Sequence, residues 1–171
     1  MPARQRAEDP TLASTRVRRA GLRRVAAISG ALLLLLLDQL TKLLIQRAFA
    51  PGDSIPLLPP LLSLTYVQNT GAAFGLFKGQ QVLFIVLALA ISAWIVREML
   101  AGPPLGLAAA WGLPLVLGGS VGNLIDRVRF GYVVDFLDLH VWPVFNVADS
   151  AITVGVALLL WGAVTPSRRG G

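Results

Sequence analysis

Four long apolar segments determine what this chain can fold into. They cover residues 25–45, 82–96, about 105–125 and 146–164. Their lengths approach or reach the ~20 residues that an apolar α-helix needs to cross roughly 30 Å of hydrocarbon. Charged residues make up only 14% of the 171 residues, whereas about a quarter is usual for a soluble domain. The sequence therefore predicts a membrane protein that is mainly α, with four transmembrane helices.

The basic residues predict the orientation of these helices. Seven arginines lie in residues 1–24, which we expect to form a disordered cytoplasmic tail, and Arg97, Arg168 and Arg169 fall on the same side of the membrane. The other side receives the five remaining basic residues, Lys42, Arg47, Lys78, Arg127 and Arg129. Positive charge accumulates on the cytoplasmic side, so both termini are predicted in the cytoplasm. The net charge of +6 thus reflects topology, and we expect no nucleic-acid partner.

The pair Arg18-Arg19 in front of the first apolar segment is also compatible with a cleaved export signal. Such a signal ends in a small-residue cleavage site. The sequence DQLTK, residues 38–42, occupies that place instead. We therefore expect the first segment to remain in the protein as a helix.

Two segments between the predicted helices indicate short β-strands. Residues 62–66 alternate between apolar and polar side chains, and an Asn-Thr-Gly turn at 69–71 follows them; residues 130–139 are rich in Val, Tyr and Phe. Residues 51–60, which precede the first strand, are rich in turn-forming Pro and Gly. We expect the strands to form a small extracytoplasmic β cradle.

The acidic residues are concentrated in one stretch. Residues 118–152 hold four of the nine acidic side chains, Asp126, Asp135, Asp138 and Asp149. Because side chains alternate along an extended segment, Asp135 and Asp138 should point to opposite faces. At most one of these two can easily face a single site, but spacing alone does not select a pair from the four.

Two neighbouring aspartates at a membrane surface suit one kind of chemistry. They do not ionise together readily, so they share a proton and titrate as a pair. The ionised member can take a proton from water as that water attacks a peptide carbonyl, which the protonated member polarises. This aspartic peptidase chemistry requires no metal and no other cofactor. The chain has no cysteine and one histidine, which excludes a thiol nucleophile and disfavours a zinc site built on imidazoles.

Several polar residues in the predicted helices have a structural interpretation. Asp38 and Lys42 are four residues apart with the acid first, the favourable order for a helical ion pair. Asn123 and Asp126 lie on one side of the third helix. Asp149 falls in the first turn of the fourth helix, where free N–H groups favour a carboxylate.

Five motifs in this order resemble those of lipoprotein signal peptidase, the bacterial type II signal peptidase family of aspartic peptidases. They are DQLTK (38–42), QNTGAAFG (68–75), GNLIDR (122–127), GYVVDF (131–136) and FNVADSAI (145–152). The resemblance covers residues 28–164. It implies a four-span peptidase domain over residues 25–164, with residues 165–171 as a cytoplasmic C-terminal tail and residues 1–24 outside the resemblance.

The resemblance also implies a reaction and roles for individual residues. The family removes the signal peptide from diacylglyceryl-modified prolipoproteins by cleaving before the lipidated cysteine. Its catalytic dyad falls on Asp135 and Asp149. Positions that line or support the site fall on Asn69, Gly71, Asn123, Arg127 and Asn146, and structural polar positions fall on Asp38, Lys42 and Asp126; Asp138 is left as a loop or surface acid.

The expected setting follows from that reaction. The enzyme should be a multi-pass protein of the bacterial cytoplasmic (inner) membrane, with its active site near the outer leaflet. Its partners should be the prolipoprotein substrate and membrane lipids, and we expect it to act as a monomer.

Two other classes of function fit parts of the sequence. Acids within membrane spans often mark proton or ion pathways, but Asp135 and Asp149 flank a loop between two spans and do not lie mid-span. A purely structural membrane anchor gives no reason for so many polar residues at one end of the helices.

Overall fold

The computed structural model describes residues 10–71, 80–101 and 106–165, and it contains four long helices and three strands. The helices are α1 (Pro10–Ala48), α2 (Gln81–Ala101), α3 (Leu107–Phe130) and α4 (Val147–Val164). Each is long and apolar enough to cross a membrane. The predicted architecture of four membrane-spanning helices with a small sheet is confirmed.

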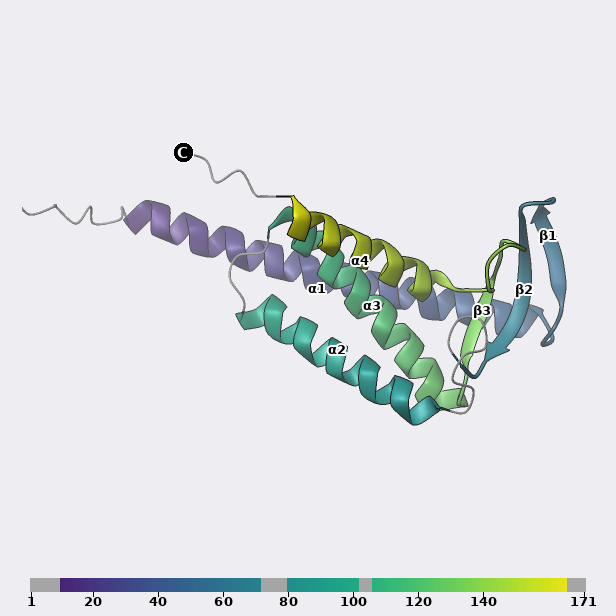
Figure 1. The fold of residues 1–171 in the computed structure, drawn as a ribbon. Helices are drawn as coiled ribbons and strands as arrows, with labels where there is room; N and C mark the ends of the chain where they lie inside the picture. The colour runs from purple at the N-terminus through teal and green to yellow at the C-terminus, as the bar shows by residue number, and fades with distance from the viewer. Residues whose placement is uncertain (1–9, 72–79, 102–105, 166–171) are drawn as a thin grey trace, which may run out of the picture.

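Helix α3 lies at the centre of the bundle and packs against α1, α2 and α4 (Figure 1). Glycines allow its backbone to approach two neighbours closely. A Cβ atom added to Gly118 would lie 2.7 Å from the carbonyl oxygen of Ala31 in α1, and one added to Gly119 would lie 2.5 Å from that of Ala148 in α4. Helix α2 packs mainly on α3, whereas α4 packs on both α3 and α1.

The three strands form an antiparallel sheet in the order β1-β2-β3 at one end of the bundle (Figure 1). They are β1 (Ser54–Leu58), β2 (Leu62–Asn69) and β3 (Val133–Asp138). A small core joins the sheet to the end of α1 and contains Ile45, Tyr66, Val134 and Phe136. Strand β3 is thereby fixed between α1 and the start of α4.

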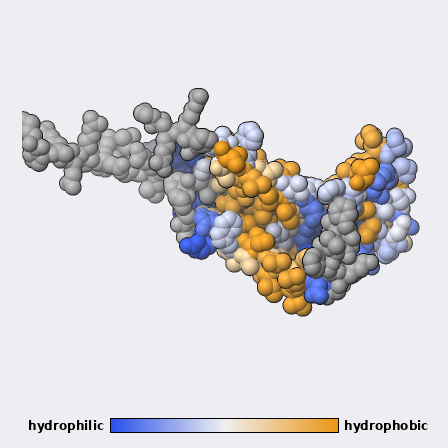
Figure 2. Space-filling model, in the orientation of Figure 1, coloured by the Kyte–Doolittle hydropathy of each residue, from blue (hydrophilic) through white to orange (hydrophobic). Residues whose placement is uncertain are grey.

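The sheet lies at the end of the molecule opposite the start of α1 and the end of α4 (Figure 1). The end of α2 and the start of α3 lie at the same end as the start of α1, as a four-span protein with both termini on one side requires. Figure 2 shows apolar side chains over the helical part and a mixed surface over the sheet. Large exposed apolar side chains occur on all four helices, which suits contact with lipid.

Several boundaries differ from those that the sequence predicted; helix α2, for example, ends at Ala101 and not at residue 96. Helix α1 begins at Pro10 and not at residue 25, so residues 10–24 are helical and not disordered. Their many Ala, Leu and Arg residues are good helix formers, whereas the prediction used only their low apolar content. Helix α3 continues past residue 125 to Phe130 and ends at Gly131, whose φ of 76° suits glycine. The following strand consequently begins at Val133 and not at residue 130.

Strand β1 was not predicted, because residues 51–60 were interpreted as turns. All five of its residues are exposed and one is Pro56, so neither alternation nor burial marks it. Edge strands often have this composition, since one edge needs no hydrogen-bond partner.

Candidate active site

A cavity of about 670 Å³ lies between α2, α3 and α4 and reaches the edge of the sheet. Asp135 from β3 and Asp149 from the first turn of α4 both line it. Of the four aspartates between residues 118 and 152, the structure brings these two to one cavity wall. Asp126 lies deeper in the protein and Asp138 lies at the far end of β3.

The carboxylate of Asp135 is held by two side-chain amides. Its Oδ1 accepts a hydrogen bond of 2.7 Å from Asn146 Nδ2, and its Oδ2 accepts one of 2.8 Å from Asn69 Nδ2. The orientation of the Asn69 amide is fixed in turn, because its Oδ1 accepts from the backbone N–H of Gly71 at 2.9 Å. The predicted supporting residues Asn69, Gly71 and Asn146 therefore all act on one carboxylate.

Asp149 forms a reciprocal capping box with Asn146 at the start of α4. The backbone N–H of Asp149 donates to Asn146 Oδ1 at 2.8 Å, and the backbone N–H of Asn146 donates to Asp149 Oδ2 at 3.3 Å. The other oxygen, Oδ1, accepts a hydrogen bond of 2.7 Å from Asn123 Nδ2. Asp149 is therefore both a capping acid and a side chain that faces the cavity.

The two carboxylates influence each other electrostatically. Asp135 is only 1% exposed. Burial, followed by the negative charge of Asp149, raises the pKa of Asp135 from 3.8 to about 7, against the opposing hydrogen bonds of Asn69 and Asn146 and the positive charge of Lys42. One carboxyl group of the pair therefore keeps its proton at neutral pH more readily than an ordinary aspartate.

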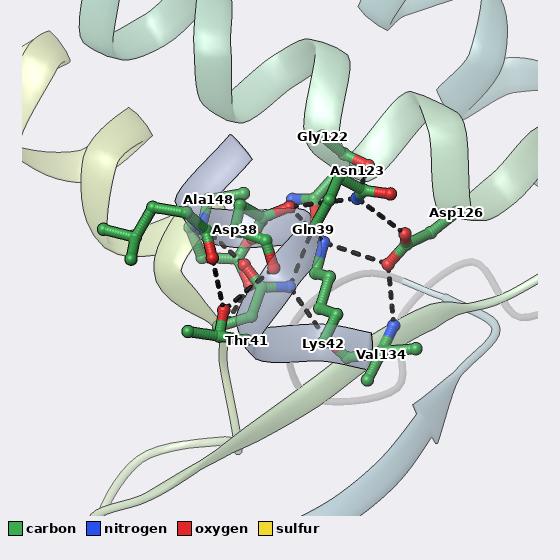
Figure 3. Close-up of polar contacts among 12 residues, drawn as sticks. Asp38, Gln39, Thr41, Lys42, Gly122, Asn123, Asp126, Val134 and Ala148 are labelled. Atoms are coloured by element: carbon green, nitrogen blue, oxygen red, sulfur yellow. Dashed lines mark hydrogen bonds and ion pairs between the residues drawn. The ribbon is translucent and has the colours of Figure 1, made fainter. Parts of the chain in front are cut away.

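A second cluster of charged groups contains Asp38, Lys42 and Asp126 (Figure 3). The ammonium of Lys42 is 2.9 Å from Asp38 Oδ2 and 2.9 Å from Asp126 Oδ2, and all three side chains are almost completely buried. The predicted ion pair between Asp38 and Lys42 is confirmed. Asp126 enlarges it to a buried triad.

Backbone groups use the remaining oxygens of these acids. Asp38 Oδ1 accepts from the backbone N–H of Ala148 at 3.0 Å, and Asp126 Oδ2 accepts from that of Val134 at 3.1 Å. The first contact ties α1 to the start of α4, and the second ties α3 to β3. The triad thus positions the two elements that carry the dyad, in agreement with a structural role for its members.

Asn123 connects the two clusters. Its Oδ1 accepts hydrogen bonds from Lys42 Nζ at 2.9 Å and from Asn146 Nδ2 at 3.1 Å, while its Nδ2 donates to Asp149. A continuous chain of hydrogen bonds therefore leads from the Lys42 ammonium to Asp149.

Arg127 lies at the cavity beside the dyad. Its Nη1 donates to the backbone oxygen of Asn123 at 3.3 Å, and its guanidinium carbon is 5.0 Å from the centre of the Phe84 ring. Its buried Nε has no hydrogen-bond partner within residues 10–71, 80–101 and 106–165.

Asp138 belongs to a different group of residues, as strand alternation predicted. It is the last residue of β3 and accepts hydrogen bonds from Thr65 Oγ1 at 2.9 Å and from the backbone N–H of His140 at 2.8 Å. These bonds, with that of His140 first, lower the pKa of Asp138 below 3.8. Asp138 is thus a structural acid within the sheet, where a loop or surface position was expected, and it does not line the cavity.

Two parts of the site carried little signal in the sequence. Gln39 donates from one Nε2 atom to Asp38, to Asp126 and to the backbone oxygen of Gly122, so it belongs to the buried cluster. Helix α2 contributes a whole cavity wall, which includes Phe84, Ile91 and Trp94. No periodic polar residue distinguishes that face, because α2 is apolar on all sides. Residues 72–75 of the QNTGAAFG motif lie outside the described part of the chain.

Two solved structures have the same fold. Both are described as bacterial membrane enzymes determined by the in meso method, and both are 32% identical to this chain. One has a TM-score of 0.77 and the match covers 85% of this chain and 93% of the other; the second has a TM-score of 0.75 with 82% and 94% covered.

Curated relatives match over most of their length. Lipoprotein signal peptidase of Moorella thermoacetica is 46% identical over 141 residues, which cover 82% of this chain and 94% of the relative. Lipoprotein signal peptidase of Halothermothrix orenii is 45% identical over 129 residues, with 75% and 88% covered. The family model described as signal peptidase (SPase) II matches residues 30–165. This chain therefore belongs to the signal peptidase II family.

Proposed function

We propose that this protein is an aspartic endopeptidase that removes the signal peptide from diacylglyceryl-modified prolipoproteins, and that it cleaves before the lipidated cysteine. The observation that supports this most directly is the placement of Asp135 and Asp149. Both face one cavity, and each carboxylate accepts hydrogen bonds from neutral amide groups. No ion pair with another described residue neutralises either acid, which suits two groups that transfer protons.

The chemistry needs one ionised and one protonated carboxyl group. The ionised carboxylate takes a proton from a water molecule as the water oxygen bonds to the carbonyl carbon, while the protonated carboxyl gives its proton to the carbonyl oxygen. The resulting diol collapses when the amide nitrogen accepts a proton from the first carboxyl and the C–N bond breaks. The second carboxyl recovers its proton from the diol hydroxyl, which restores the starting state of the dyad.

The cavity suits a lipidated peptide within a membrane. From Asp149 its wall follows α4 through Ile152 and Val156 to Leu159, a distance of about 15 Å at 1.5 Å per residue. This wall and the facing wall of α2 are apolar, as acyl chains and a signal helix require. Near the dyad, the guanidinium of Arg127 lines the cavity and can donate to a substrate carbonyl oxygen.

The location of the dyad supports an active site near the outer leaflet. Asp135 lies in strand β3 of the sheet, at the end of the molecule opposite the start of α1 and the end of α4 (Figure 1). If both termini are cytoplasmic, as the basic residues predict, this end faces the extracytoplasmic side of the cytoplasmic (inner) membrane. We further propose that the protein acts as a monomer that binds its substrate directly among membrane lipids.

Cleavage of a diacylglyceryl-modified prolipoprotein in liposomes tests this proposal. Asp135→Asn and Asp149→Asn should each lower the cleavage rate by roughly 10²–10⁴-fold, because each removes one proton-transfer group. Asp138→Asn is the matched control and should cleave near the wild-type rate, since Asp138 lies outside the cavity. Retained cleavage by either dyad variant, or an inactive but folded Asp138→Asn protein, would contradict the assignment. An unmodified prolipoprotein should not be cleaved.

A further inference from the structure

The buried triad of Asp38, Lys42 and Asp126 is larger than a helix-packing contact requires. Only one side chain, that of Asn123, separates the Lys42 ammonium from Asp149. The ammonium contacts Asp38 and Asp126 and donates its third hydrogen bond to Asn123. A Lys ammonium has three donors and no acceptor. All three donors of Lys42 are therefore committed, one of them toward the active site.

This contact determines which way the Asn123 amide points. If the amide were rotated by 180°, its NH₂ group would face two donors, Lys42 Nζ and Asn146 Nδ2. Only the observed orientation pairs every donor with an acceptor. Lys42 therefore directs the Asn123 NH₂ group at Asp149, where the distance is 2.7 Å.

The two members of the dyad receive unequal support for a negative charge. Asp149 accepts from an amide that is polarised by an ammonium, and it lies in the first turn of α4, where the helix dipole favours an anion. Asp135 lies on a strand and accepts from two amides. One of these, Asn146 Nδ2, also donates to Asn123 Oδ1 and to the backbone oxygen of Val134.

We propose that Lys42 is a positioning residue for the dyad: acting through Asn123, it makes Asp149 the carboxylate that stays ionised and leaves the shared proton on Asp135. Asp149 is then the base that accepts the proton of the attacking water, and Asp135 is the acid that protonates the carbonyl oxygen. This division of roles rests on the proposed peptidase function. It gives Lys42 a part in the reaction in addition to holding α1 and α3 together.

The charged groups around the dyad agree with this division. Within the described residues, α1 supplies Asp38 and Lys42, and α3 supplies Asp126 and Arg127. Among these, only Lys42 is joined to a dyad carboxylate through one intervening side chain, and it reaches Asp149. Arg127 contacts the backbone of Asn123 and the Phe84 ring, and no hydrogen bond joins it to either carboxylate.

The position of the proton can be measured without cleavage. Protein labelled with [4-¹³C]aspartate shows a carboxylic C=O infrared band that is distinct from the carboxylate band. At about pH 5.5, the band of the buried protonated carboxyl should disappear in Asp135→Asn and remain in Asp149→Asn. Any other pattern in these two variants overturns the assignment of the proton. Absence of prolipoprotein cleavage by the wild type would defeat the proposed function separately.

The role of Lys42 requires a variant that removes the ammonium and leaves only one of its two acids, Asp38, charged. The double variant K42M/D126N keeps the net charge of the triad, and D126N alone is the control that retains the bond from Lys42 to Asn123. In the double variant, the pH at which kcat/KM falls on the acidic side should rise by about one unit, because Asp149 becomes easier to protonate. In D126N alone, the pH at which kcat/KM falls on the acidic side should not rise.

A purely structural lysine predicts a different result. Thermal unfolding and helix content would change in both variants, but the pH at which kcat/KM falls on the acidic side would be the same in the double variant and the wild type. That outcome overturns the positioning role. If the double variant does not fold, the infrared comparison of the two dyad variants still decides which carboxyl carries the proton.

Discussion

Replacing Asp135 by asparagine should change the stability of the protein in a direction that depends on pH. The pKa of Asp135 is raised to about 7 in the folded protein from 3.8. A group whose pKa is raised on folding stabilises the folded state fully below its unfolded pKa, and this stabilisation is lost as pH rises through the folded pKa. The wild type should therefore lose stability as pH rises from about 4 to 7. Asp135→Asn should not show this pH-dependent loss of stability.

The size of the effect follows from the shift and from the contacts of Asp135. A rise of about three units in the pKa of Asp135 corresponds to a change of about 4 kcal/mol in the free energy of unfolding, at ~1.4 kcal/mol per unit. Asparagine has one acceptor oxygen, whereas the Asp135 carboxylate accepts from both Asn69 and Asn146. One of these donors loses its partner, which costs about 2 kcal/mol. The variant should be less stable than the wild type by about 2 kcal/mol near pH 4 and more stable by a similar amount above pH 7.

Thermal unfolding in detergent, followed by the fluorescence of the four tryptophans, measures this reversal. A swing of about 4 kcal/mol corresponds to a change on the order of 10 °C in the Tm difference between the two proteins for a chain of this size. Asp138→Asn is the control, because hydrogen bonds lower the pKa of Asp138 and its contribution is instead lost as pH falls. A Tm difference between the wild type and Asp135→Asn that stays constant from pH 4 to pH 8 would refute the reasoning.

Three further predictions concern the reaction, the packing and the topology. Because the reaction needs one protonated carboxyl and Asp135 has a pKa of about 7, kcat/KM for a lipidated substrate should fall as pH rises above ~7; constant activity up to pH 9 would contradict this. Gly119→Ala should reduce the yield of folded protein and its Tm, since the new methyl group would lie 2.5 Å from a carbonyl oxygen of α4, whereas Gly21→Ala meets nothing within 4 Å and should be neutral or stabilising. The chain has no cysteine, so a membrane-impermeant maleimide applied to spheroplasts should label Val141→Cys but not Thr165→Cys; the reverse result would invert the topology.

Features that depend on one segment at a time could be predicted from the sequence. The apolar segments predicted all four helices, and strand alternation correctly separated Asp135 from Asp138. The spacing of Asp38 and Lys42 correctly predicted their ion pair. Each of these inferences needs only the local periodicity of a helix or a strand.

Features that depend on several segments required the structure. Residues of α1, α3 and the start of α4 meet at Asn123, and no local pattern shows that Lys42 and Asn146 donate to the same oxygen atom. Asp126 was expected to be structural, and its bond to the backbone of Val134 depends on how β3 passes the end of α3. Strand β1 was missed because all of its residues are exposed.

The unequal packing of the helices determines how a membrane-embedded substrate can reach the dyad. Helices α3 and α4 meet backbone to backbone at Gly112 and Gly155 as well as at Gly119, so this wall of the cavity is rigid. Helix α2 packs on α3 but has no extensive interface with α4 in the described residues, although both line the cavity. If the proposed function holds, we expect a signal helix to enter sideways between α2 and α4 in a two-dimensional search within the bilayer. Its acyl chains would then exchange one hydrocarbon environment for another without passing through water.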